Sequence, residues 1–262
     1  MTICTLASSS SGNATIVSHG NTHLLIDAGI SLRKIREGLK SLDLTPDDIA
    51  GVLVTHEHSD HVKGLEMLTK YHNTSIFSSV GAGHGIYHSK NQLEPYINGF
   101  EIGIAFEMGD VIVSSFNIPH DACQSVGFCL QAGGKTLAYA TDLGYVTQEV
   151  MDAMRGADIA IIESNHDKKM LKSGPYPAPL KRRVASKYGH LSNDDCGLFA
   201  VELVKSGTKY LQLSHLSKEN NTPILAKKTV GQAMADVGIS VDEDVILDVA
   251  LPFSPSKIYE II

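Results

Sequence analysis

The sequence lacks the features that would direct a protein out of the cytosol. Residues 1–17 are too polar around the serines for a signal peptide, and no apolar run approaches the length of a membrane span. The four cysteines include no Cys-x-x-Cys pair, so we expect reduced thiols. We therefore predict a cytoplasmic protein with no membrane partner.

Linkers are also absent, because no Pro- or Gly-rich stretch is long enough to separate domains. The 262 residues suffice for one large globular domain. Strands come first, helices follow, and the same mixture begins again near residue 138, which indicates two sheets packed face to face with helices outside. We predict an α/β (α+β) fold, a four-layer αββα sandwich. Residues 1–262 would form a single domain of two similar halves, about 1–137 and 138–262.

The densest group of potential metal ligands follows a predicted buried strand at residues 52–54. The four residues are His56, His58, Asp60 and His61, and residues 62–70 then read as a helix. Imidazole nitrogens and carboxylate oxygens suit zinc, manganese or iron. His56 and His58, two positions apart, can point at one ion, while Asp60 and His61 are better placed for a second. The spacing predicts a metal site.

The His-x-His-x-Asp-His pattern of residues 56–61 resembles the signature of the metallo-β-lactamase-fold hydrolases. It is most similar to the branch that uses two metals on phosphodiesters, and that branch has the αββα fold predicted above. With Asp142 bridging the two ions, the resemblance implies these ligands: His56, His58 and His120 for the first ion, and Asp60, His61 and His215 for the second. Asp27, at the end of another predicted strand, would orient the histidine loop from behind.

The opening segment, residues 6–13, resembles a narrower group, the YycJ/WalJ family of DNA exonucleases or accessory proteins of a cell-wall sensor system. The resemblance places this loop at the rim of the metal site, where Ser10, Ser11 and Asn13 could touch substrate. Plain turn chemistry is the alternative interpretation. Cys123 and His166 stay open as further ligands: Cys123 is more simply a packed thiol, and His166 a substrate contact.

One segment is strongly basic although the net charge is −7: residues 168–187 contain seven basic and no acidic residues. A local basic cluster on an acidic body is typical of a phosphate-backbone footprint. Lys181, Arg182 and Arg183 are its central candidates for substrate contact. A solvated loop and surface helix are the alternative.

Two candidate site segments flank this basic stretch. In the first, Asn165 and His166 follow a predicted strand and are candidate substrate contacts. In the second, Ser192 is a natural N-cap, and exposed backbone N–H groups there can bind a phosphate. His190 resembles in position the histidine that related tRNA-processing nucleases use to protonate the leaving oxygen. A packed or solvent-facing side chain is the alternative for His190.

These features predict a dinuclear-metal phosphodiesterase with two divalent ions per chain, zinc or manganese, with iron as a third option. Water held between ions roughly 3.5–4 Å apart would become the attacking hydroxide. Asp60, Asp142 and His190 would be the catalytic residues. The substrate would be nucleic acid, with DNA favoured over RNA, as in a 5'-3' DNA exonuclease.

Two alternatives stay open. A small-molecule hydrolase of the same fold would act on a cyclic phosphodiester, a thioester or a lactam, and the basic cluster argues against it. A non-enzymatic accessory protein of a cell-wall sensor system would be expected to have lost ligands, and none is missing.

Overall fold

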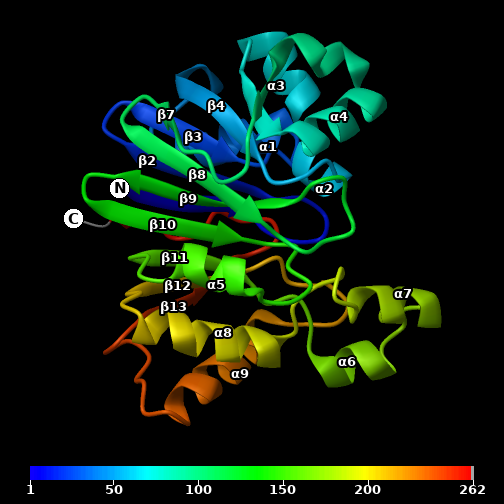
Figure 1. The fold of residues 1–262 in the computed structure, drawn as a ribbon, viewed down its shortest axis with the longest axis vertical. Helices are drawn as coiled ribbons and strands as arrows, with labels where there is room; N and C mark the ends of the chain where they lie inside the picture. Colours follow the sequence, from blue (N-terminus) through cyan, green and yellow to red (C-terminus); the bar gives the residue numbers. More distant parts are fainter. Residues whose placement is uncertain (261–262) are drawn as a thin grey trace.

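In the computed structural model, which describes residues 1–260, two seven-stranded sheets pack face to face (Figure 1). One sheet has the order β14-β1-β2-β3-β4-β5-β6 and the other β13-β12-β11-β10-β9-β8-β7. Helices α1, α3 and α4 cover the outer face of the first sheet, and α5, α8 and α9 cover that of the second (Figure 1). The predicted four-layer αββα sandwich is confirmed.

The elements have the following bounds. The strands of the first sheet are β1 (Thr2–Ala7), β2 (Ala14–His19), β3 (Thr22–Ile26), β4 (Ile49–Val54), β5 (Ile76–Ser79), β6 (Ile97–Phe100) and β14 (Tyr259–Glu260). Those of the second are β7 (Phe106–Met108), β8 (Val111–Asn117), β9 (Val126–Ala132), β10 (Lys135–Ala140), β11 (Ile159–Glu163), β12 (Tyr210–Ser214) and β13 (Ile246–Val249). The α-helices are α1 (Leu32–Lys40), α2 (Ser59–Val62), α3 (Leu65–His72), α4 (Val80–Ser89), α5 (Gln148–Met154), α6 (Lys168–Ser173), α7 (Ala178–Val184), α8 (Asn193–Lys205) and α9 (Pro223–Ala235).

The core is layered because successive residues of a strand point to opposite faces. Leu24 and Ile26 of β3 belong to the cluster between the sheets, with Phe128 and Ile161 of the second sheet. Leu25 faces the other way, into the cluster under the outer helices. Strands buried on both faces read as nearly continuous apolar runs. Each fully buried Leu or Ile side chain contributes about 1.5–3 kcal/mol of transfer free energy.

The helix predicted over residues 62–70 is interrupted at Gly64, which separates α2 from α3. The Gly64 N–H donates to the Ala28 carbonyl, 2.8 Å away, and an added Cβ would lie 2.2 Å from the Ile30 carbonyl oxygen. This close approach of two backbones holds the histidine loop against the loop that follows β3.

The chain passes from the first sheet to the second between β6 and β7, earlier than the predicted boundary near residue 137, and returns to the first sheet at β14. A single domain over residues 1–262 stays a prediction, and residues 261–262 lie outside the described part. No helix within residues 1–260 combines the length and apolar character needed to cross a bilayer.

Candidate metal centre

The site lies at one edge of the two sheets, where several strands end. Strand β3 is parallel to β4, and β10, β11 and β12 are parallel to one another. Because parallel strands end at the same edge of a sheet, the residues that follow them meet there. Asp27 follows β3, His56 follows β4, Asp142 follows β10 and His215 follows β12.

Three of these residues have left-handed backbone conformations: Asp27 at φ 60°, Asp142 at φ 57° and His215 at φ 56°. Such conformations are uncommon for residues other than glycine and persist only where the surroundings enforce them. At His215 the backbone N–H donates to Ser8 Oγ at 2.7 Å, and the carbonyl accepts from Asn165 Nδ2 at 2.8 Å. Distant segments therefore hold the turn that aims the histidine.

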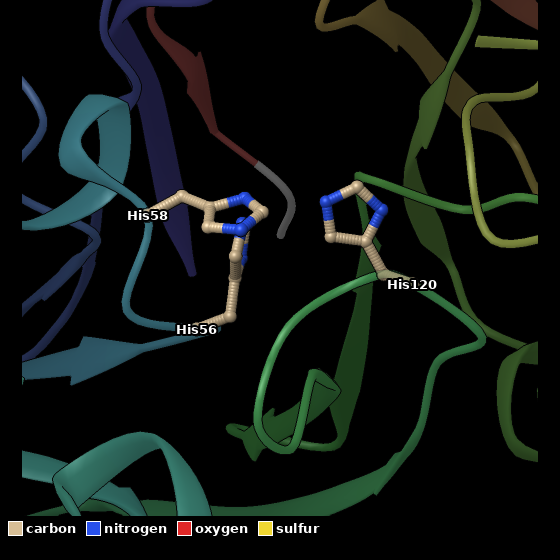
Figure 2. Close-up of side chains that lie close together, drawn as sticks. All are labelled: His56, His58 and His120. Carbon is tan, nitrogen blue, oxygen red and sulfur yellow. The ribbon is translucent and has the colours of Figure 1, made fainter. Parts of the chain in front are cut away.

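The first ligand group is His56, His58 and His120, whose rings face one another across a small space (Figure 2). The ring centroid of His56 lies 4.6 Å from that of His58 and 5.0 Å from that of His120. One nitrogen from each of the three rings can be chosen so that all lie within 4.8 Å of one another. This arrangement suits three ligands of one ion.

The second group is Asp60, His61 and His215, whose ligand atoms also lie within 4.8 Å of one another. Asp142 lies between the groups: its Oδ2 is 3.2 Å from His61 Nε2, and its Oδ1 is 3.7 Å from His120 Nε2. A carboxylate in this position can reach ions held by either group.

Groups behind the ligands orient the histidine rings. The Nδ1 of His61 lies 2.7 Å from Asp27 Oδ2, and that of His120 lies 3.2 Å from the Gly189 carbonyl oxygen. The Nδ1 of His56 lies 3.1 Å from Thr55 Oγ1, whose hydroxyl donates in turn to Asp27. Hydrogen bonds at Nδ1 leave Nε2 free to face the shared space, as in most histidine metal sites. Asp27 thus contacts both Thr55 and His61 from behind the histidine loop.

The donor atoms fit a divalent metal. Among residues 1–260, the buried Nε2 atoms of His56, His120 and His215 have no hydrogen-bond partner, although buried polar atoms are nearly always partnered. Burial holds the pKa of His56 well below its ordinary value and lowers that of His120, so both imidazoles are neutral with a free lone pair. The cluster is therefore a divalent-metal site.

Glu163, the last residue of β11, is the main site residue that the sequence did not single out. Its buried Oε1 lies 2.7 Å from His215 Nδ1 and 2.9 Å from His190 Nδ1, so one oxygen orients both rings. Burial alone would raise the pKa of this carboxyl, but His190 and His215 outweigh burial and lower it to about 2. The sequence did contain a signal for this residue, because an acidic side chain at the end of an apolar strand indicates a position at the edge where the site lies.

The structure separates the predicted contacts of the opening loop. Ser10 and Ser11 are exposed at the tip of the loop. Asn13 is fully buried, with its backbone N–H donating to the Asp60 carbonyl at 2.8 Å and its Nδ2 lying 3.1 Å from His61 Nε2. Asn13 therefore supports the histidine loop rather than offering a surface to substrate. Asn165 is likewise buried and holds His215, so we no longer count either asparagine as a substrate contact.

The residues of the basic segment are not equivalent. Lys181 and Arg182 line a cavity of about 410 Å³ together with His166, His190 and Ser192. Arg183 is instead paired with the carboxylate of Asp121, the residue that follows the ligand His120.

The start of α8 also differs from expectation. Ser192 is the N-cap and accepts from the Asp195 N–H, while the Asn193 N–H donates to the His166 carbonyl. These backbone donors are therefore engaged rather than free for a phosphate.

Cys123 is exposed, which corrects the predicted packed thiol. Within residues 1–260, neither Cys123 nor His166 joins a cluster of potential ligands.

Two facing sheets with paired histidine and aspartate clusters at one edge define a metallo-β-lactamase-fold hydrolase. The family model described as beta-lactamase superfamily domain matches residues 22–215. The chain belongs to this superfamily, and within it to the YycJ/WalJ family.

Relatives and solved structures agree with that assignment. Exodeoxyribonuclease YycJ of Bacillus anthracis is 35% identical over 256 residues, covering 97% of this chain and 96% of that protein. Exodeoxyribonuclease WalJ of Streptococcus pneumoniae is 36% identical over 244 residues, covering 90% of each. The crystal structure of the metallo-β-lactamase-fold protein YhfI of Bacillus subtilis has a TM-score of 0.73 at 15% identity, covering 97% of this chain and 98% of that one. This last likeness concerns the fold alone.

Proposed function

We propose that the protein is a two-metal phosphodiesterase that degrades nucleic acid, with DNA as the favoured substrate. The observation that carries the proposal is the junction of a cluster for two ions with a cavity lined by Lys181 and Arg182. His190 connects the two, because it lines the cavity and its Nδ1 lies 3.7 Å from Asp142 Oδ1. The two relatives named exodeoxyribonucleases, which match nearly the whole chain, support the same substrate class.

The residues of the chain would divide the work as follows. One ion would be held by His56, His58 and His120. The other would be held by Asp60, His61 and His215, and Asp142 would contact both ions. When bound, zinc or manganese would supply Lewis acidity and make water nucleophilic near neutral pH. His190 donates its Nδ1–H to Glu163, which leaves Nε2 available, and a proton on Nε2 would pass to the leaving oxygen.

Metal binding should saturate at two ions per chain and release protons. Burial disfavours charge on His61 and His215. Asp27 and Asp142 outweigh burial at His61, where the pKa rises well above its ordinary value. At His215, the nearby carboxylates of Asp142, Asp60 and Glu163 outweigh burial and raise the pKa to about 10. Both histidines are therefore protonated without metal at pH 7, and each must lose its proton to become a ligand.

We expect at least two protons released per chain, one from each histidine, and zinc affinity that increases as the pH rises toward about 10, because deprotonation precedes binding. Titration calorimetry in two buffers of different ionisation enthalpy measures the release, and elemental analysis measures the stoichiometry. One ion per chain after reconstitution, or a pH-independent affinity, would contradict the paired site.

The salt dependence of binding tests nucleic acid as the substrate. Each cation that contacts a phosphate backbone releases a counterion, so log Kd should change steeply with log salt. Changing Lys181 and Arg182 together to alanine should reduce that slope on duplex DNA by about 2, roughly one for each lost contact. Fluorescence anisotropy with a labelled oligonucleotide at several salt concentrations gives the slope.

The matched control changes Lys227 and Lys228, exposed on α9, which lowers the charge equally away from the site. That variant should keep the wild-type slope. If the Lys181 and Arg182 variant also kept it, the small-molecule hydrolase would become the better proposal.

A further inference from the structure

The cavity beside the metal site has a distinct chemical character. It lies between α6, α7 and the start of α8 and has a volume of about 410 Å³. Helices α6 and α7 project together beyond the ends of β10 and β11 (Figure 1). Its lining includes three cationic side chains and two histidines: Lys172, Lys181, Arg182, His166 and His190.

The charges that line this cavity do not cancel. Lys168 and Asp195 also line it, but they pair with each other at 3.1 Å, and Asp195 further accepts from the Ser192 hydroxyl. Within residues 1–260, Lys172, Lys181 and Arg182 have no carboxylate partner in an ion pair. Three uncompensated cations are more than the single charge of one phosphodiester requires. They suit a phosphate monoester, which carries about −1.5 to −2 at neutral pH.

His166 adds a neutral hydrogen-bonding group to this charge. His166 is buried, with 3% of the residue exposed, and its Nδ1 has no hydrogen-bond partner within residues 1–260. Its backbone is fixed because its carbonyl accepts from the Asn193 N–H at 2.9 Å. The His166 ring thus contributes to the wall of the cavity, while the charge that a ligand would meet there comes from the cations.

The cavity adjoins the reaction centre rather than lying apart from it. His190 lines the cavity, and its Nδ1 lies 3.7 Å from Asp142 Oδ1. Gly144, two residues after Asp142, lines it as well. A phosphate bound here would therefore neighbour the phosphate held at the metals, as successive phosphates do along one strand.

We propose that this cavity binds the terminal phosphate monoester of a nucleic-acid strand, so that the enzyme recognises a phosphorylated end and cleaves next to it. The proposal rests on the proposed nuclease function, since it names the part of the substrate that this function would use. The hydrogen bond from Lys181 Nζ to the Lys172 carbonyl, 2.7 Å long, ties α7 to α6 beside the cavity.

Three oligonucleotides of one sequence test the proposal, with a phosphate at the 5' end, at the 3' end or at neither. The metal-loaded protein should hydrolyse one phosphorylated form about tenfold faster or more, in kcat/KM, than the hydroxyl form. The form preferred identifies which end is recognised. Fluorescence anisotropy with a chelator present measures the same preference as binding, without any turnover.

Two substitutions in α6 test whether the cavity causes this preference. Lys172→Gln removes a cation that lines the cavity, and because this side chain is exposed and unpaired the fold should be unaffected. It should reduce the preference to about threefold or less. Lys169→Gln is the matched control: Lys169 is exposed on the same helix and does not line the cavity. It should keep the wild-type preference.

The outcomes separate the two proposals. Equal binding and equal rates for the three oligonucleotides would overturn the end-recognition site while leaving the nuclease intact. An equal loss of preference in both variants would overturn it too, because bulk charge would then explain the effect. If the loaded wild-type protein cleaved neither the oligonucleotides nor bis-nitrophenyl phosphate, the nuclease proposal would fail. Binding in chelator would still decide whether the cavity prefers a phosphate.

Discussion

Replacement of Asp142 by asparagine is expected to lower turnover on any phosphodiester by about three orders of magnitude while the chain stays folded. The loss follows because the carboxylate lies between the two ligand groups and a neutral amide cannot hold two cations as closely. Asparagine keeps the shape of the side chain and tolerates the φ of 57° at this position. Turnover and metal content are measured on the same sample.

Asp43 provides the matched control for this substitution. It is an exposed aspartate with a φ of 56° and belongs to none of the ligand groups. Asp43→Asn therefore reports the effect of the same exchange in the same backbone conformation, and it should leave turnover and metal content unchanged. The bridging role of Asp142 would be wrong if Asp142→Asn kept near-wild-type turnover together with two bound ions.

Replacement of His190 by alanine is expected to slow DNA hydrolysis by about 10²–10⁴-fold, the usual contribution of a positioned general acid. Nitrophenyl esters should slow far less, because nitrophenolate departs without a proton. The geometry supports this split: Glu163 orients the ring, and His190 keeps partial access to the cavity with 14% of its side chain exposed. Rates on both substrate types, with metal content as a check, measure it.

An exposed histidine on α4, His88, supplies the comparison. His88→Ala removes the same imidazole side chain from the surface and should change neither the DNA rate nor the nitrophenyl ester rate. If His190→Ala slowed the nitrophenyl ester as much as DNA, the residue would position substrate instead of donating a proton.

The sequence alone predicted the layered fold and the ligand-rich loop at residues 56–61. Both follow from local information, because strand periodicity and the position of a polar residue just after an apolar run are visible in a few consecutive letters. His56, His58, Asp60 and His61 occupy six positions, so one turn of backbone brings them together whatever the rest of the chain does. Recognising the family signature then indicated which later strand ends should carry the partners.

Only the tertiary structure decided how these residues are held and which polar groups remain free. Glu163 joins His190 and His215 across separations of 27 and 52 residues, and Arg183 pairs with Asp121 across 62. The same long-range packing buries Asn13 behind His61, and within the described residues 1–260 it leaves Lys172 beside the cavity without a carboxylate partner. A hydrogen bond or an ion pair depends on distances of a few ångströms between groups far apart in the chain. Local pattern and propensity carry no information about such distances, so the sequence indicated candidate ligands while the fold determined their environment.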